Sequence, residues 1–277
     1  MIDGDLILMA APTGARRSKM DHENLPITPE EIAAEARRCM RAGAAVIHLH
    51  VRDKDGAHSL DPGRYAEALD QIRTATGDGI VAQVTSESLD RYTPDQQIEA
   101  MKAVKPEAVS VSVRDICPGP NEEPAAFAFF QWLKDNHVWP QFILYDADDA
   151  LRFKAMMEAG SIPFAIPYVL YVLGRFTPGQ VSMPSDLYPY LSAMSGAPKH
   201  RWGLCAFGPG ETACVREALE RGGDARVGFE NNMTKPDGKL AAHTSELVDL
   251  AREAGLACGR RRMDADALRQ RIPEWIG

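Results

Sequence analysis

The sequence predicts an α/β fold of the TIM-barrel type, a (β/α)8 barrel that forms one domain over residues 1–277. Short apolar runs alternate with helical patterns from one end of the chain to the other, which indicates βα units and a parallel sheet. The length suits one barrel, and no linker, repeat or low-complexity tract divides the chain. A doubly wound sheet with an extra lobe is the alternative that these observations leave open.

Eight apolar or β-branched runs have the length of a barrel strand and are separated by segments with helical periodicity. Because helices separate them, consecutive strands are expected to lie parallel. The expected strands are Leu6–Ala11, Ala45–Val51, Ile80–Thr85, Ala108–Val113, Gln141–Tyr145, Phe164–Val169, Arg201–Ala206 and Ala225–Glu230.

The intervening helices begin at capping residues. Thr28 and Thr93 each precede a proline, which favours an N-cap followed by proline at the first helical position. Asp61 is expected to cap the helix after the second strand, and Asp146 or Asp148 the one after the fifth. Later helices are expected at Glu211–Arg221, Thr244–Ala254 and, outside the barrel at the C-terminus, Ala265–Arg271. Glycines expected to end helices are Gly43, Gly77, Gly160, Gly222 and Gly255.

Composition restricts the partners of the chain. With 31 basic and 39 acidic residues the formal charge is −8, which argues against nucleic acid or an anionic membrane as the main partner. The five cysteines are scattered and include no CxxC pair, so we expect neither a disulfide framework nor a thiolate zinc site. The apolar stretches are too short for a secretion signal or a membrane helix. We therefore expect a cytoplasmic protein.

His48 and His50 are the first candidates for a functional site. Side chains two apart on a strand share a face, and two neutral imidazoles that converge can bind Zn²⁺ or another divalent transition metal. The charged turn Arg52–Gly56 follows directly and places the pair at the C-terminal mouth of its strand, where TIM-barrel active sites lie. The alternative is a pair of hydrogen-bonded core histidines.

Glu230 is the candidate third metal ligand. Strand alternation from an inward Arg226 through Gly228 directs Glu230 to the same mouth as the histidines. Two histidines and one carboxylate leave coordination positions open for water or substrate, as in catalytic metal sites. The alternative is an exposed loop acid.

Several motifs of this chain together resemble the β-keto acid cleavage enzymes, which include 3-keto-5-aminohexanoate cleavage enzyme. The matching segments are Ala11–Ala15, Asn24–Ile32, Ala42–Asp53, Lys105–Glu107, Arg226–Glu230 with Asn232, and Glu246–Val248. The resemblance implies a TIM barrel with a divalent metal, usually zinc. It also implies an acyltransferase that condenses a β-keto acid with acetyl-CoA, yielding acetoacetate and a new acyl-CoA, and a homotetramer.

The resemblance also assigns roles to individual residues. It implies that His48, His50 and Glu230 bind zinc, which would act as a Lewis acid on the keto acid. Arg226 matches the catalytic arginine of the family. The other catalytic positions hold altered residues: Thr85 where serine is common, Ser110 where threonine is common, and Asn231 where an aspartate acts as a base.

Asn231 is the sharpest departure from the family, because a neutral amide cannot accept a proton at ordinary pH. Another group must then serve as the base. The candidates are a water on the metal, which we favour, and Glu87 after the third strand, which is equally compatible with a solvated loop acid.

Three further positions differ in charge from the family pattern. Arg16 replaces the acid that usually follows the Thr-Gly-Ala motif, and Gln141 and Ile143 replace two glutamates of the fifth strand. These changes make the pocket more positive, so we expect an acidic or uncharged substrate side chain rather than an ammonium-bearing one. Alternatively, Arg16 lies on the rim in an ion pair.

Two other functions remain compatible with the sequence. The runner-up is a metal-dependent lyase or hydrolase on the same barrel that does not use acetyl-CoA, because Asn231 removes a proposed base. A silent metabolite-binding barrel is the third, although the joint presence of Arg226 and the three proposed ligands argues against it.

Overall fold

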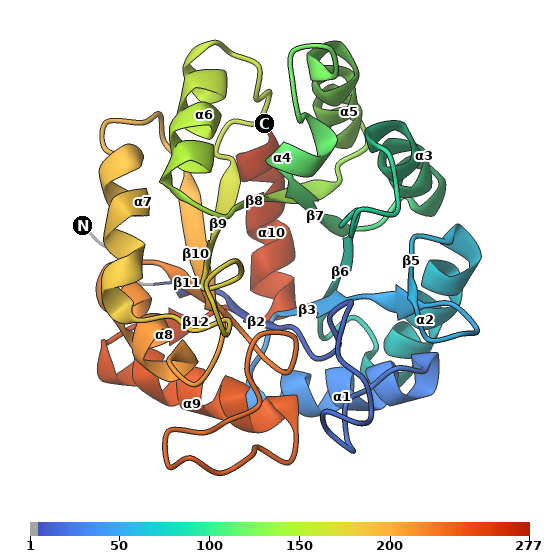
Figure 1. Ribbon diagram of the computed structural model, residues 1–277, viewed down its shortest axis with the longest axis vertical. Helices are drawn as coiled ribbons and strands as arrows, with labels where there is room; N and C mark the ends of the chain where they lie inside the picture. Colours follow the sequence, from blue (N-terminus) through green and yellow to red (C-terminus); the bar gives the residue numbers. More distant parts are fainter. Residues whose placement is uncertain (1–4) are drawn as a thin grey trace.

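The computed structural model describes residues 5–277 and contains a closed barrel of parallel strands (Figure 1). Each strand pairs with the next barrel strand in the sequence, and β11 pairs with β2 to close the barrel. The TIM-barrel prediction is therefore confirmed, and the doubly wound alternative is wrong. The barrel strands are β2 (Leu8–Ala10), β3 (Val46–Leu49), β6 (Val81–Thr85), β7 (Ala108–Ser112), β8 (Trp139–Leu144), β9 (Tyr168–Leu173), β10 (Arg201–Ala206) and β11 (Asp224–Val227).

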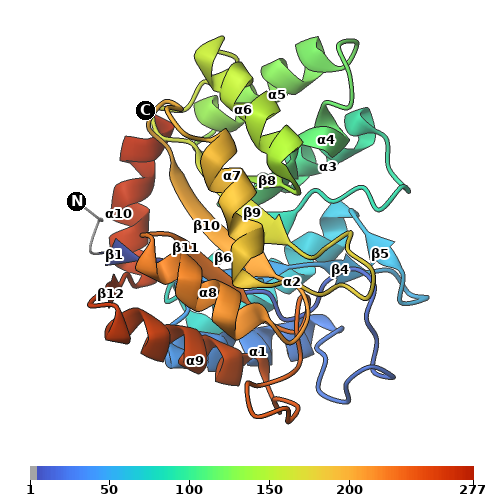
Figure 2. The ribbon, with the colours of Figure 1, turned by 60° about the vertical axis from the view of Figure 1, so that its left-hand side comes forward.

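Helices surround the strands on the outside of the barrel (Figure 2). They are α1 (Pro29–Ala42), α2 (Pro62–Thr76), α3 (Pro94–Val104), α4 (Val113–Ile116), α5 (Glu123–Asp135), α6 (Ala147–Glu158), η1 (Pro184–Leu187), α7 (Tyr188–Ala193), α8 (Glu211–Glu220), α9 (Thr244–Ala257) and α10 (Ala265–Ile276). Outside the barrel, β1 (Asp5–Leu6) pairs with β12 (Arg261–Arg262), and β4 (Val51–Arg52) forms a hairpin with β5 (His58–Ser59).

The predicted C-terminal helix covers the N-terminal end of the barrel. On α10, Arg269 donates to the carbonyl of Ile80 at 3.0 Å, directly before β6. Trp275 packs against Trp139 at the start of β8, with ring centroids 5.7 Å apart. The opposite, C-terminal end of the strands is left for the loops that carry the candidate site residues.

The predicted helix caps are present. Thr28 and Thr93 accept hydrogen bonds from the third helical residue and form capping boxes, and Asp61 caps α2. Asp146, rather than Asp148, caps α6 by accepting from the amide of Asp149 at 2.8 Å. Four of the five glycines expected to end helices have positive φ, namely Gly43, Gly77, Gly160 and Gly222.

Gly255 corrects one of these predictions, because it lies inside α9 rather than at its end. A Cβ at this position would collide with the side chain of Leu6. The glycine therefore lets α9 pack closely on β1 instead of ending the helix.

Two of the predicted strands differ most from the observed ones. The sixth strand was expected at Phe164–Val169, but β9 begins only at Tyr168, because Pro167 has no amide to donate to a ladder. The eighth strand was expected to reach Glu230, but it ends at Val227. Gly228 then adopts a φ of 142°, and its carbonyl accepts from the amide of Asn231 at 2.8 Å. Glu230 thus lies in a turn.

The five cysteines are free thiols. Within residues 5–277, no helix is both long enough and apolar enough to cross a membrane.

Candidate active site

His48, His50 and Glu230 converge at the C-terminal mouth of the barrel. The Nε2 atoms of the two histidines lie 3.1 Å apart. Oε2 of Glu230 lies 3.4 Å from Nε2 of His48 and 3.6 Å from Nε2 of His50. One ligand atom from each residue can therefore meet at a single point, with all three within 4.8 Å of one another. The structure brings together the three residues that the sequence selected.

The charge states of this cluster suit a cation. Nδ1 of His48 lies 2.8 Å from Oε1 of Gln83, which fixes the ring and turns Nε2 toward the cluster. Burial lowers the pKa of His48 to about 3, so the imidazole is neutral. Burial opposes the ionisation of Glu230, but Arg226, His48 and His50 together hold its pKa well below the usual range. The neutral imidazole of His48 thus faces an ionised carboxylate.

The turn that carries Glu230 is anchored on two sides. The amide of Glu230 donates to the carbonyl of Ala11 at the end of β2, at 3.0 Å. Glu211, at the start of α8, accepts from the amide of Gly228 at 3.2 Å and from Nδ2 of Asn232 at 3.1 Å. A side chain at Gly228 would collide with the Ala11 carbonyl, so glycine is required where β2 and this turn meet. These contacts, rather than strand alternation, direct Glu230 to the mouth.

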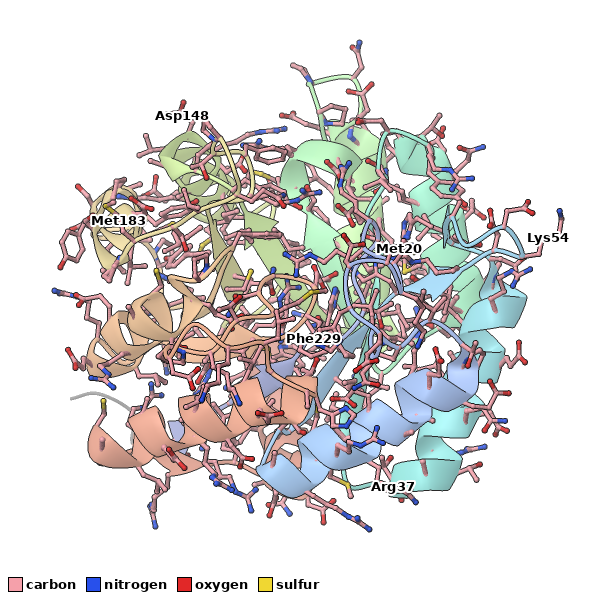
Figure 3. The ribbon with its side chains drawn as sticks, turned by 60° about the horizontal axis from the view of Figure 1, so that its bottom comes forward. Met20, Arg37, Lys54, Asp148, Met183 and Phe229 are labelled. Carbon is pink, nitrogen blue, oxygen red and sulfur yellow. The ribbon has the colours of Figure 1, made fainter. Side chains whose placement is uncertain are left out.

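Two arginines hold the loop after β2 against this turn. Arg52 donates to the carbonyls of Gly14 at 2.7 Å and Arg17 at 2.9 Å. Arg17 in turn donates to the carbonyls of Phe229 at 2.7 Å and Asn231 at 3.2 Å. Figure 3 labels Met20 on the first segment and Phe229 on the second. The loop and the turn therefore form one hydrogen-bonded unit at the mouth.

Arg226 is poised to bind an anionic group. Its side chain is 3% exposed, and Nη2 donates to Oε1 of Glu230 at 3.1 Å and to Sγ of Cys205 at 3.3 Å. Nε and Nη1 have no hydrogen-bond partner among the described residues. Buried donors without partners are costly, so they favour a ligand oxygen that would accept from them.

A pocket open to solvent lies over the cluster and Arg226. It is lined by His48, His50, Thr85, Glu87, Ser112, Ile143, Tyr145, Val172, Arg175, Phe207, Arg226 and Glu230. The lining combines polar and charged groups with aliphatic and aromatic ones. Such a mixed cavity fits a small molecule with one anionic end.

The remaining predicted catalytic residues take different positions. Thr85 lines the cavity, and its Oγ1 accepts from the amide of Glu87 at 3.0 Å. Ser110 lies behind it and donates to that oxygen at 3.4 Å. Asn231 is fully buried and lines neither this cavity nor the adjoining one, and both polar atoms of its amide lack a partner among the described residues.

Glu87 is a cavity residue. Its side chain is 17% exposed, with Oε2 3.9 Å from Nδ1 of His50 and Oε1 3.4 Å from Nη2 of Arg175. The interpretation as a solvated loop acid is therefore wrong. Arg16, by contrast, is exposed at the rim, as one alternative expected, but it forms no ion pair with any residue in the described range.

Of the two fifth-strand positions, Ile143 lines the cavity, and Gln141 is directed into the barrel, where Nε2 contacts Sδ of Met9 at 3.1 Å. Sequence reasoning missed Tyr145 and Arg175 as cavity residues. Arg175 follows β9, whose end was placed too early. The apolar run Tyr168–Leu173, followed by a glycine, was the signal that could have revealed it.

Comparison with known proteins identifies the family of this chain. The family model for the beta-keto acid cleavage enzymes matches residues 5–273. The chain belongs to this family. It is 30% identical over 264 residues to a 3-keto-5-aminohexanoate cleavage enzyme of Acetoanaerobium sticklandii, covering 90% of this chain and 93% of the relative. It is 28% identical to a 3-oxoadipate:acetyl-CoA acetyltransferase of Cupriavidus necator, covering 87% and 85%.

Solved structures share the fold. The apo structure of ObcA superposes with a TM-score of 0.72 at 19% identity, covering 90% of this chain and 65% of the ObcA chain. A type I 3-dehydroquinate dehydratase of Clostridium difficile superposes with a TM-score of 0.59 at 15% identity, covering 92% and 94%. At these identities the likeness supports the barrel alone.

Proposed function

We propose that this family member condenses a β-keto acid with acetyl-CoA, giving acetoacetate and a new acyl-CoA, with zinc bound by His48, His50 and Glu230. The observation that carries the proposal is the buried His-His-Glu cluster beside Arg226, whose two free guanidinium nitrogens are buried at the same cavity. Acetyl-CoA as the second substrate is supported by the names of relatives, among them the acetyltransferase of Cupriavidus necator.

The donor set fits a divalent metal. The imidazole of His48 is neutral, Glu230 is ionised, and its Oε2 is buried without a hydrogen-bond donor. Gln83 orients His48, and Glu87 lies beside the remote nitrogen of His50, as outer groups do around histidine ligands. When bound, the metal supplies Lewis-acid polarisation of the keto acid oxygens and leaves open positions for them.

Arg226 binds the substrate carboxylate through Nε and Nη1, while Nη2 remains on Glu230. Because these donors are fixed before substrate arrives, they also stabilise negative charge that develops as the carbon–carbon bond changes. Thr85 presents its hydroxyl on the cavity wall, and Ser110 holds that hydroxyl from behind. We propose that Thr85 contacts a substrate oxygen and that Ser110 positions the hydroxyl of Thr85.

Glu87 is the base in this proposal. It replaces the metal-held water favoured from the sequence, because Glu87 is the carboxylate at the cavity that is not a proposed ligand. Asn231 cannot take this role, since its amide accepts no proton and the residue lies outside the cavity. We assign Asn231 to the packing of the Glu230 turn. The main-chain carbonyl of Asn231 accepts hydrogen bonds there from Arg17 and from the amide of Gly208.

The proposed reaction begins at the carbon between the ketone and the carboxylate of the keto acid. Glu87 takes a proton from the carbon between the ketone and the carboxylate, and that carbon forms a bond to the acetyl carbonyl as the CoA thiolate leaves. The thiolate attacks the original ketone carbon, and the bond between that carbon and the carboxymethyl carbon breaks. The carboxymethyl carbon recovers the proton from Glu87. Acetoacetate therefore contains the acetyl group of acetyl-CoA and the carboxymethyl group of the keto acid.

A panel of β-keto acids, incubated with and without acetyl-CoA, tests this function. We expect acetoacetate and a new CoA thioester only when both substrates are present. Release of products from the keto acid alone would instead establish the lyase or hydrolase alternative. A zinc-loaded protein that binds keto acids but forms no product in either condition would leave only the binding-barrel alternative. The homotetramer stays a prediction, which light scattering of the purified protein would check.

A further inference from the structure

A second cavity adjoins the first at the barrel mouth. It is lined by residues 13–17 of the loop after β2 and by Glu87, Arg175, Gln180, Phe207 and Glu230. Glu87, Arg175, Phe207 and Glu230 line both cavities, so the two share these four residues as walls. A ligand held at the His-His-Glu cluster would reach this second space, which we call the arginine pocket, by passing these side chains.

The arginine pocket carries an excess of positive charge. Its two carboxylates already have cationic partners, since Glu87 pairs with Arg175 at 3.4 Å and Glu230 with Arg226 at 3.1 Å. Arg17 donates to backbone carbonyls, which do not neutralise it. Arg16 is exposed and forms no ion pair with any residue of the range 5–277. Two guanidinium charges of this pocket thus lack a carboxylate in contact.

We propose that the arginine pocket binds a second carboxylate of the keto acid, so that the substrate is a β-keto diacid. The inference rests on the proposed function, in which Arg226 and the metal ligands hold the first carboxylate and the ketone. The pocket opens on Glu230 and Glu87, so the group bound there is the far end of the molecule held by the cluster. Phe207 packs along the passage, which suits the methylene chain between the two ends.

Sequence identity to the relatives does not distinguish an amino-bearing keto acid from a β-keto diacid as the substrate. The relatives named for an amino-bearing keto acid and for 3-oxoadipate, a β-keto diacid, are 30% and 28% identical to this chain. The charge of the pocket does distinguish them, because an ammonium group would meet Arg16 and Arg17, which line this pocket alone, whereas a carboxylate would pair with Arg16.

The first test measures binding without turnover. Adipate and hexanoate have the same chain length and differ by one carboxylate, so calorimetric titration of the zinc-loaded protein isolates the second charge. We expect adipate to bind about 10- to 100-fold more tightly, the size of a hydrogen-bonded charge pair. Arg16→Gln should remove most of this preference, and Arg16→Glu should reverse it. Equal affinity of the two acids would overturn the proposal.

The matched control is Arg37→Gln, which removes the same charge from an exposed arginine on α1 that forms no ion pair with a described residue (Figure 3). This change should leave the preference for adipate intact. An equal loss in Arg37→Gln and Arg16→Gln would show that net charge, rather than the pocket, attracts the diacid, and would overturn the proposal.

The second test separates the keto acid from a CoA phosphate as the source of the bound anion. The ratio of kcat/KM for 3-oxoadipate over 3-oxohexanoate should fall about 10- to 100-fold in Arg16→Gln, while the KM for acetyl-CoA changes little. A raised KM for acetyl-CoA with an unchanged ratio would assign the pocket to phosphate and overturn the proposal. Tight adipate binding with no turnover would instead refute the proposed function and leave this inference standing.

Discussion

Glu211 is buried beneath the turn that carries Glu230 and makes the stability of the protein depend on pH. The residue is 1% exposed, and burial raises its pKa to about 8 although Asn232 and the amide of Gly228 donate to it. In the unfolded chain the carboxyl ionises near its ordinary value, whereas in the folded protein it keeps its proton up to about pH 8. The variant that isolates this effect is Glu211→Gln, which is neutral at every pH.

The sign and size follow from proton linkage. Between the unfolded and folded pKa values the folded state holds one more proton, so the free energy of unfolding falls as pH rises, by about 1.4 kcal/mol per pH unit. From about pH 5.5 to about pH 7.5 the ionisation of Glu211 therefore lowers the free energy of unfolding of the wild type by about 2.7 kcal/mol. In Glu211→Gln this residue contributes no change over the same range. The stabilisation that comes from the raised pKa of Glu211 is fully present below the unfolded pKa and is lost by about pH 8.

Urea denaturation at these two pH values measures the difference directly. A chelator in all samples removes any contribution of bound metal to stability. The control is Glu220→Gln, which changes an exposed glutamate at the end of the same helix and should keep the wild-type slope. Parallel pH slopes for the wild type and Glu211→Gln would refute the reasoning, because they would show that Glu211 ionises normally in the folded protein.

Four further substitutions test the site itself. His50→Ala should reduce zinc from about one equivalent to less than about a tenth by elemental analysis, because two ligands do not hold the ion; full retention would contradict the ligand set. Glu87→Gln should lower kcat by about 10²- to 10⁴-fold with zinc retained, and a change of less than about threefold would return the role of base to another group. Arg226→Lys should lower kcat about 10²-fold or more at unchanged zinc content, because an ammonium cannot hold Glu230 and present a fork of donors together. Asn231→Asp should not raise the rate of cleavage, because the residue is buried outside the cavity and Glu87 is the base; a raised rate would return the role of base to position 231.

The sequence predicted the ligands more reliably than the path of the chain that presents them. His48 and His50 were found from their two-residue spacing, which fixes the face of a strand, and from the charged turn that follows them. Glu230 was found for a reason that the structure does not support. Strand alternation was expected to direct it, whereas a turn at Gly228 does so. Glu211 and Ala11, two hundred residues apart in the chain, both accept hydrogen bonds from this turn.

The residues that escaped prediction depend on contacts between distant segments. Arg175 was missed because an apolar run interrupted by Pro167 was taken as one strand, which put the strand end before the arginine. Glu87 was correctly placed after the third strand, but only the fold shows that His50 and Arg175 enclose it. Local pattern identifies an element, whereas a tertiary contact decides which face of its loop is buried.

The fate of the acetyl group is the most direct test of the proposed reaction. When the protein is given a β-keto acid and acetyl-CoA labelled at its carbonyl carbon, the account predicts acetoacetate that carries the label at its ketone carbon and a new acyl-CoA that carries none. Carbon NMR of the products locates the label. Unlabelled acetoacetate, or label that stays in acetyl-CoA while the keto acid is consumed, would contradict the central claim that this barrel joins the two substrates.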